Sequence, residues 1–174
     1  MILNFKLSEY RTKLFKQLLL LVLAVSLVSC GFKLRGAYEL PAAMQVTYID
    51  HQQINSELVR SLKIALKASD IIIADTKTDD VAVLRLYKET KDKRTVSVDT
   101  QGRAREYTLA YALRFSVKTN EQKFEITEQV IRIERDFIFD PEDVLGNSRG
   151  ESQLYEEMQH DLVRLLLLRL QSKT

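Results

Sequence analysis

Cysteine is almost absent from this chain of 174 residues, since Cys30 is the only one. Long apolar runs are absent too. The longest, residues 18–28, has 11 residues, well short of the roughly 20 that a helix needs to cross a bilayer. The chain also lacks internal repeats, low-complexity tracts and any linker typical of a second domain. These absences argue against an intrachain disulfide, a permanent transmembrane helix and a multidomain protein.

Recognisable catalytic motifs are absent as well. The chain has no Gly-x-Ser-x-Gly elbow, no His-Glu-x-x-His zinc pair and no glycine loop that would hold a phosphate. Its two histidines, His51 and His160, each follow or precede an aspartate, Asp50 and Asp161. Adjacent residues seldom orient one another for proton transfer, so we interpret both histidines as ordinary surface or helix residues. We expect no enzymatic activity.

Metal and nucleic-acid sites are not indicated either. Asp140, Glu142 and Asp143 are close in sequence but miss the ligand spacing of a calcium-binding EF-hand. A turn or helix-capping role at Asp140 fits better. There is no basic cluster or aromatic-rich RNA motif, which argues against a nucleic-acid partner. We predict no metal and no nucleic acid.

The N-terminal residues have the order of an export signal. Four basic residues and Glu9 precede the apolar run, which ends at Ser29, Cys30 and Gly31. An apolar run of this length with basic residues before it and small residues after it is typical of a secretory signal peptide. The position of Cys30 is that of a bacterial lipidation signal. We expect residues 1–29 to be removed and Cys30 to carry acyl chains; a signal anchor or a buried helix is the alternative.

Removal of residues 1–29 changes the interpretation of charge. Those residues hold four basic and one acidic side chain, so their loss takes the formal net charge from +2 to −1. Acylated Cys30 would leave no thiol for a disulfide, so the fold must be held by its core alone. Residues 30–174 are enough for one domain with a sizeable core. We therefore predict a signal peptide over 1–29 and a single domain over 30–174, with residues 31–41 as a tether leading into it.

Residues 107–118 carry the strongest periodic signal. Large apolar side chains alternate with small or polar ones, which predicts a long antiparallel strand with one buried face. The apolar set is Tyr107, Leu109, Tyr111, Leu113, Phe115 and Val117.

The segments on either side complete a sheet. Residues 81–99 predict a strand interrupted by the charged patch 88–94, and Thr100-Gln101-Gly102 predicts a tight hairpin turn. After a turn at 120–122, apolar residues of the segment 123–139 move from even to odd positions, which predicts a β-bulge near Gln129-Val130.

Two amphipathic helices are expected. Residues 54–69 show one apolar face, between a short strand at 45–50 and another beginning at 71. A second helix is predicted over 151–171, with Glu151, Glu156 and Glu157 near its N-terminus. The run 165–168 is four leucines, too apolar for a helix with only one buried face, so it is either deeply buried or in contact with a partner.

This order of elements lacks the regular alternation of a doubly wound parallel sheet. The architecture that buries both helix faces is an α+β fold, with two helices packed on one face of a mostly antiparallel sheet of about four strands.

The first residues of the predicted domain form a distinctive motif. Residues 30–36 read Cys-Gly-Phe-Lys-Leu-Arg-Gly, which resembles the Cys-Gly-aromatic-x-Leu-Arg opening of the LptE family of lipopolysaccharide-assembly lipoproteins. Residues 102–107, Gly-Arg-Ala-Arg-Glu-Tyr, resemble its Gly-x-x-x-Glu-Tyr segment, and Phe139-Asp140-Pro141 before a terminal helix fits the same layout. The resemblance covers residues 30–171.

The resemblance implies a non-enzymatic role at the outer membrane. Members of the family plug the lumen of the β-barrel LptD as a heterodimer of about 1:1, assist its assembly and bind lipopolysaccharide during transfer to the outer leaflet. No cofactor is expected beyond the N-acyl and S-diacylglycerol groups (including palmitate) on Cys30. Gly31 in place of aspartate after the cysteine implies sorting to the cell outer membrane, lipid-anchored and facing the periplasm and barrel lumen.

The basic residues that could meet lipopolysaccharide are candidates by position. Phosphates call for arginine or lysine at exposed turns, which singles out Arg103 and Arg105 beside the hairpin turn and Arg149 in the segment 141–150, taken as a loop. Thr100 stands where the family pattern has an arginine, so either this function has shifted to Arg103 or the chain binds sugar or phosphate elsewhere. The alternative for these arginines is solvated surface charge or a cross-strand pair with Glu106.

For the whole protein, the alternative function is that of another periplasmic interaction or chaperone lipoprotein, similar to a pilotin, without lipopolysaccharide binding.

Overall fold

The computed structural model describes residues 16–17, 38–119 and 124–172. The chain divides into two units, Met1–Arg35 and Gly36–Thr174, and the sheet and both long helices belong to the second. Cys30, nearly all of the predicted signal peptide and the expected turn at 120–122 lie outside the described residues. Within the described parts, no helix has the length and hydropathy needed to cross a membrane.

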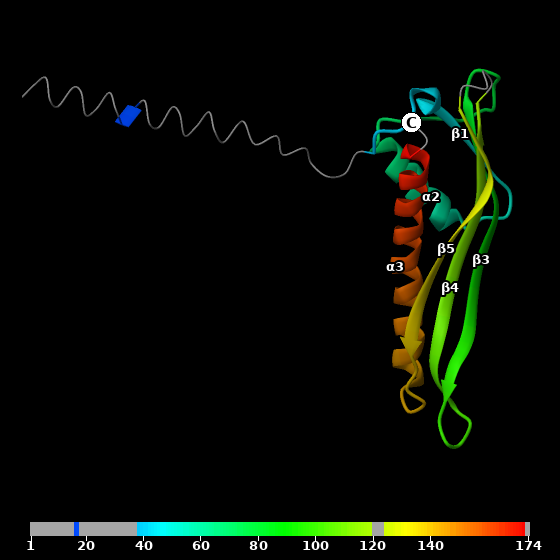
Figure 1. Cartoon of the computed structure of the whole chain (residues 1–174), viewed down its shortest axis with the longest axis vertical. Coiled ribbons are helices and arrows are strands. Elements are labelled where there is room, and N and C mark those ends of the chain that lie inside the picture. The colour runs from blue at the N-terminus through cyan, green and yellow to red at the C-terminus, as the bar shows by residue number, and fades with distance from the viewer. Residues whose placement is uncertain (1–15, 18–37, 120–123, 173–174) are drawn as a thin grey trace, which may run out of the picture. The chain divides into compact units, whose positions relative to one another are not determined.

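A five-stranded sheet carries both long helices on one of its faces (Figure 1). Strand β1 pairs in parallel with β2 and β3, whereas β3–β4 and β4–β5 are antiparallel. The expected α+β class is confirmed, with one strand more than the four expected. The elements are η1 (Ala42–Met44), β1 (Val46–His51), α2 (Ser56–Lys67), β2 (Ile72–Ala74), β3 (Ala82–Val98), β4 (Ala104–Lys118), β5 (Glu125–Ile138) and α3 (Val144–Gln171), and the sheet order is β2-β1-β3-β4-β5.

Strand β4 forms the centre of the core, as its alternation predicts. The side chains that face the helices are fully buried from Leu109 to Val117, and the partly buried Tyr107 packs beside them. On the opposite face, Ala110 and Ala112 lie among charged residues of the neighbouring strands. The sheet therefore has one apolar and one polar face. The fully buried set is Leu109, Tyr111, Leu113, Phe115 and Val117.

Strand β3 is continuous, so the expected interruption at 88–94 is wrong. Its pairing with β4 runs without a break from Lys88 to Thr95, and the register shifts lie on either side of this stretch, between Leu86 and Lys88 and between Thr95 and Val98. Strand β1 pairs with β3 only as far as Leu86. Among the described strands, the rest of β3 thus has a neighbour on one side only, and charged side chains are accommodated easily at such an edge.

The bulge in β5 is confirmed and lies just before the expected position. Phe115 pairs with Gln129 and Val117 with Ile126, so β5 contains one extra residue in this interval. The side-chain direction changes as a result. Ile126 and Ile131 both reach the core, although an unbroken strand would point them to opposite faces.

Helix α2 begins where a side chain replaces the missing backbone acceptor. The Asn55 side chain accepts a hydrogen bond from the Glu57 N–H at 2.8 Å. After the helix the chain turns at Asp70, which has a φ of 60°, and enters β2. This crossover returns the chain in the same direction, which explains the parallel pairing of β1 with β2.

Helix α3 begins at Val144, not at residue 151 as expected. The Asp143 side chain accepts a hydrogen bond from the Gly146 N–H at 2.8 Å and caps the first turn. Glu151, Glu156 and Glu157 therefore lie beyond the first turn, and the expected interaction with the N-terminal end of the helix dipole is wrong, because that effect fades within a turn.

The leucine run 165–168 belongs largely to the core. Leu166 is fully buried and Leu167 is 1% exposed, whereas Leu165 is half-buried and Leu168 is 41% exposed. Three of the four leucines thus pack against the sheet or α2. Of the four, Leu168 leaves the largest part of an apolar side chain for solvent or a partner.

Candidate functional site

The turn between β3 and β4 brings two predicted arginines together at the end of the hairpin. The Gly102 N–H donates to the Asp99 carbonyl at 2.9 Å, and the Asp99 N–H donates to the Arg103 carbonyl at 2.8 Å. Gly102 has a φ of 77°, a backbone conformation that glycine adopts at little cost. The expected hairpin and its turn residues are confirmed.

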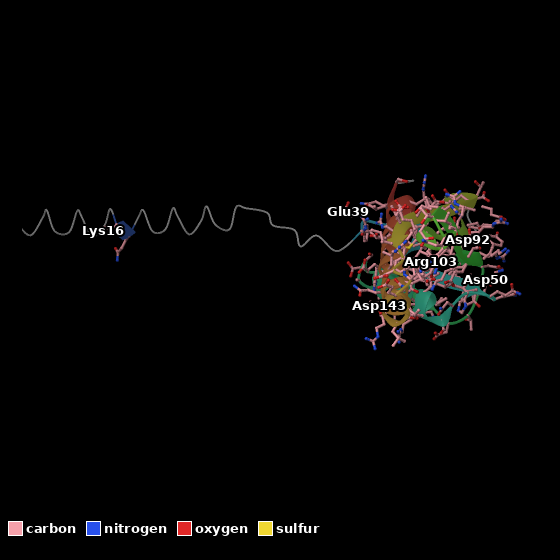
Figure 2. The ribbon with its side chains drawn as sticks, turned by 90° about the horizontal axis from the view of Figure 1, so that it is seen from below. Lys16, Glu39, Asp50, Asp92, Arg103 and Asp143 are labelled. Carbon is pink, nitrogen blue, oxygen red and sulfur yellow. The ribbon has the colours of Figure 1, made fainter. Side chains whose placement is uncertain are left out.

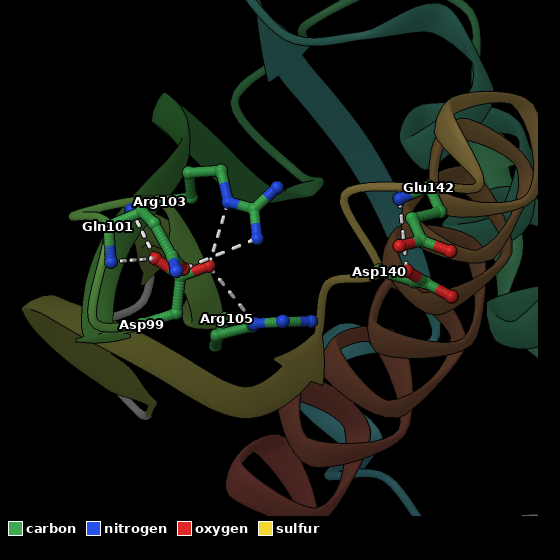
Figure 3. Close-up of polar contacts among 6 residues, drawn as sticks. All are labelled: Asp99, Gln101, Arg103, Arg105, Asp140 and Glu142. Carbon is green, nitrogen blue, oxygen red and sulfur yellow. Dashed lines mark hydrogen bonds and ion pairs between the residues drawn. The ribbon is translucent and has the colours of Figure 1, made fainter.

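A single carboxylate organises this turn. Asp99 Oδ1 accepts hydrogen bonds from the backbone N–H groups of Gln101, at 2.9 Å, and Arg103, at 2.8 Å. Asp99 Oδ2 lies 2.8 Å from Arg103 Nε and 3.6 Å from Arg105 Nε. Figure 3 shows this carboxylate between the two arginine side chains.

The charge balance of this group leaves one positive charge. Desolvation by burial raises the pKa of Asp99, but the hydrogen bonds from Arg103 and Gln101 outweigh it and hold the pKa below its ordinary value. One carboxylate therefore faces two guanidinium groups. Asp99 contacts both through Nε, and among the described residues the other side-chain acceptor beside them is Gln101, 3.5 Å from Arg103. The remaining N–H groups can donate to an external anion.

Sequence reasoning missed Asp99. It offered Glu106 as the partner of the arginines, but the Glu106 carboxylate accepts a hydrogen bond from Ser97 at 3.0 Å. The signal that could have found Asp99 is its place at the first position of the turn, where aspartate commonly accepts from backbone groups two residues on.

The corner between β5 and α3 is rigidly built. The Asp140 side chain accepts from the Glu142 N–H at 3.0 Å (Figure 3). The Asn147 side chain accepts from the Asp140 N–H at 3.0 Å and donates to the Asp140 carbonyl. The turn role expected for Asp140 is confirmed. In the described residues, no group of three or more potential ligands could hold a metal ion.

Arg149 does not lie in a loop, as expected, but in α3. Its side chain is exposed and lines a shallow hollow with Ser148, Ser152 and Gln153. The structure groups Arg103 with Arg105 and places Arg149 on a separate element.

The aspartates next to the two histidines have arginine partners. Asp50 accepts from Arg85 Nε at 2.9 Å, and Asp161 accepts from Arg135 at 2.8 Å and Arg164 at 3.2 Å. These carboxylates orient guanidinium groups rather than imidazoles.

Lysines of the charged patch point toward aromatic rings, a second feature that sequence reasoning missed. The Lys93 ammonium group lies 4.2 Å from the centroid of the Tyr107 ring and also pairs with Glu151 of α3. Lys91 lies 4.8 Å from the Tyr111 centroid and 5.4 Å from that of Tyr155. The edge of β3 is thereby attached to the helix layer, and cation–π contacts stabilise its lysines there.

Comparison with known proteins identifies the family. The model of the family described as "LptE: Lipopolysaccharide-assembly" matches residues 41–170. An LPS-assembly lipoprotein LptE from Photorhabdus laumondii is 29% identical over 153 residues, covering 87% of this chain and 83% of the relative. A protein of the same name from Pectobacterium atrosepticum is 28% identical over 154 residues, with the same coverage of both chains.

Solved structures agree with the fold. The crystal structure of rare lipoprotein B from Shewanella oneidensis has a TM-score of 0.65 and 28% identity, covering 73% of this chain and 94% of the other. The solution structure of a lipoprotein B from Nitrosomonas europaea also has a TM-score of 0.65, with 24% identity and coverage of 82% and 91%, and supports the fold alone. The family match spans the whole sheet, α2 and nearly all of α3, and so this chain belongs to the LptE family of lipopolysaccharide-assembly lipoproteins.

Proposed function

We propose that this protein is the lipid-anchored partner of the outer-membrane β-barrel LptD, in a heterodimer of about 1:1. In this role it plugs the barrel lumen, assists assembly of the barrel and binds lipopolysaccharide on its way to the outer leaflet. It acts by binding and has no catalytic activity. The observation that carries the lipopolysaccharide part is the pair of arginines that share Asp99 at the hairpin end.

The anchor follows from Cys30 and its position after the apolar run. A single acyl chain holds a protein on a membrane only marginally, and each further buried methylene adds about 0.8 kcal/mol. An S-diacylglycerol group with an additional N-acyl chain on Cys30 therefore gives stable attachment. Gly31 after the cysteine is compatible with sorting to the outer membrane.

The arginine pair suits a phosphorylated ligand. Arg103 is 55% and Arg105 47% exposed at the side chain, whereas Asp99 is only 11% exposed. The carboxylate thus positions the guanidinium groups but is itself shielded from an incoming anion. Two guanidinium groups fixed in this way can give bidentate hydrogen bonds to a phosphate with little further loss of side-chain freedom.

The partnership is tested by affinity purification through a tag at Thr174. We expect a large outer-membrane β-barrel to copurify in a ratio of about 1:1. Depletion of the protein should leave the barrel misassembled and raise permeability to large hydrophobic antibiotics. Normal barrel levels after depletion, or purification with a different partner, would favour the pilotin-like alternative.

Lipopolysaccharide binding is tested with the full-length acylated protein in detergent. The double variant Arg103→Gln with Arg105→Gln should lower the affinity for lipopolysaccharide by roughly tenfold or more, since each lost charge-assisted bond contributes about 1.5–3 kcal/mol. Arg60→Gln on α2 is the control, because Arg60 is exposed and pairs with Glu57 at 3.3 Å, away from the hairpin. Arg149→Gln measures the separate candidate on α3. Affinity equal to that of the control would count against the hairpin site.

A further inference from the structure

The three most exposed large apolar side chains among the described residues lie close together in sequence. Ile138 is 78% exposed, Leu145 73% and Val144 67%. Ile138 ends β5, and Val144 and Leu145 begin α3. Exposure of three such side chains within eight residues is unfavourable in water and marks a surface that a partner covers.

This apolar corner adjoins the arginine pair. Ile138 is paired in register with Glu106 of β4, and the next residue, Phe139, donates its N–H to the carbonyl of Arg105 at 2.8 Å. In Figure 1 the β3–β4 hairpin and the start of α3 lie at the same end of this unit, and Figure 2 looks onto that end, with Arg103 and Asp143 labelled.

The corner is also fixed relative to β5. Asn147, in the first turns of α3, bonds to both the N–H and the carbonyl of Asp140, and Asp143 caps the helix through Gly146. The backbone that carries Val144 and Leu145 is thus held by side-chain hydrogen bonds on both sides of the turn. The side chains of Val144 and Leu145 are therefore carried by a rigid part of the backbone.

We propose that Ile138, Val144 and Leu145 contact the acyl chains of an anionic lipid whose phosphates are bound by Arg103 and Arg105. The proposal rests on the proposed function and adds an acyl-chain subsite to it. Exposed apolar side chains beside two cations match a phosphorylated amphiphile. Its acyl chains are buried against the apolar side chains, and its phosphates accept charge-assisted hydrogen bonds from the cations.

The charges around this corner indicate where the phosphates and the acyl chains of the lipid lie. Asp140, Glu142 and Asp143 are exposed around the turn between β5 and α3 and outnumber Arg149, the cation four residues after Leu145 in α3, so the turn as a whole repels phosphates. Uncharged acyl chains are not subject to this charge repulsion. The lipid is therefore oriented with its phosphates toward the hairpin and its acyl chains toward Ile138 and α3.

Photocrosslinking in intact membranes identifies what covers the corner. A benzophenone side chain is placed in the full-length protein at Leu145, at Gln101 beside the arginine pair, or at Ile64 on α2, which is 64% exposed and serves as control. We expect lipopolysaccharide adducts from positions 145 and 101 and none from 64.

Adducts from 101 alone would overturn the acyl subsite and leave the proposed function intact, whereas adducts from neither would count against both. Adducts of position 145 with a protein only would show that the corner is a protein interface and overturn the proposal.

Binding to intact and deacylated lipopolysaccharide provides a second readout. Leu145→Gln should weaken binding of intact lipopolysaccharide about fivefold to tenfold, the effect of exposing a large part of one leucine side chain, and leave binding of the deacylated phosphosugar unchanged. The Arg103→Gln and Arg105→Gln variant should weaken both. Ile64→Gln is the matched control. An equal loss for both ligands in Leu145→Gln would overturn the acyl-chain assignment.

Discussion

The phenol of Tyr111 in β4 donates a hydrogen bond to the carboxylate of Glu89 in β3. Tyr111 is fully buried, and the other oxygen of Glu89 accepts from the backbone N–H of Asn55, the N-cap of α2, at 2.7 Å. One carboxylate thus joins the central strand, its neighbour and the start of a helix. This contact lies where the apolar interior gives way to the charged part of β3.

Loss of the Tyr111 hydroxyl should therefore destabilise the fold. Tyr111→Phe leaves Glu89 with one partner fewer in a partly buried position, and we expect the free energy of unfolding to fall by about 1–2 kcal/mol. Urea denaturation of the full-length protein in detergent measures it. The control is Tyr87→Phe, since Tyr87 is 38% exposed and its hydroxyl contacts Ser116 at 3.1 Å. Equal effects of the two substitutions would show that the buried hydrogen bond contributes no more to the free energy of unfolding than an exposed one.

The same residue predicts how stability changes in alkali. Burial, and then the hydrogen bond and charge of Glu89, raise the pKa of Tyr111 above its ordinary value of 10.0. Above this pH the unfolded state loses the phenolic proton while the folded state keeps it, so the free energy of unfolding falls as pH rises. Denaturation at about pH 9 and about pH 11 should show this decrease, and Tyr111→Phe should reduce it. An unchanged slope in the variant would contradict the assignment.

Asp99 should control the order of the hairpin turn. In Asp99→Asn, the amides of Gln101 and Arg103 lose a charged acceptor, and we expect their hydrogen exchange to become roughly threefold to tenfold faster. Because the folded pKa of Asp99 is lowered from 3.8, its stabilisation is present above this pH and is lost as pH falls through the folded value. An NMR titration of the carboxyl carbon checks the pKa. A midpoint at or above 3.8 would rule out this network in solution.

The leucine run 165–168 should divide into core and surface. Leu166→Ala removes a fully buried side chain and should lower the free energy of unfolding by about 2–4 kcal/mol. Leu168→Ala, at a position 41% exposed, should lower it by less than about 1 kcal/mol. Urea denaturation compares the two. A larger effect at Leu168 would mean that α3 turns a different face toward the sheet.

Lys93 and Glu151 should act as a coupled pair that attaches β3 to α3. Their side chains are 30% and 28% exposed, and the ammonium group also contacts the Tyr107 ring. In a double-mutant cycle with Lys93→Met and Glu151→Gln, we expect a coupling energy of about 0.5–1.5 kcal/mol. High salt should decrease it, because ionic screening weakens partly exposed pairs. A coupling energy of zero would leave only the contact with the ring.

Local pattern predicted β4 well, because an alternation of large apolar and small or polar residues is sufficient to define a strand with one buried face. It failed for β3 because Lys91 and Lys93 face aromatic rings and the helix layer. The charged residues are therefore part of a continuous strand and do not interrupt it. The start of α3 was hidden by Gly146, Asn147 and Gly150, which are weak helix formers. Hydrogen bonds that the side chains of Asp143 and Asn147 accept from backbone N–H groups compensate for this, and these donors are identified only in the three-dimensional structure.

The candidate site was predictable in part. The turn signal located Arg103 and Arg105, because a hairpin turn places its flanking residues at an exposed end. It could not show that Asp99 contacts both, since this depends on side-chain directions. The parallel pairing of β1 with β3 was also beyond sequence reasoning, because it joins residues 35 positions apart, such as Asp50 and Arg85.

The order of strands has a consequence for how the molecule reaches its native state. Strands β3, β4 and β5 are neighbours in both sequence and space, so their pairing closes only short loops and can be rapid. The pairing of β1 with β3 closes a longer loop, because α2 and β2 lie between them in sequence, and α3 follows at the far end of the chain. The meander would then acquire structure first, and the hairpin that carries Arg103 and Arg105 would be complete before the core beneath it is sealed.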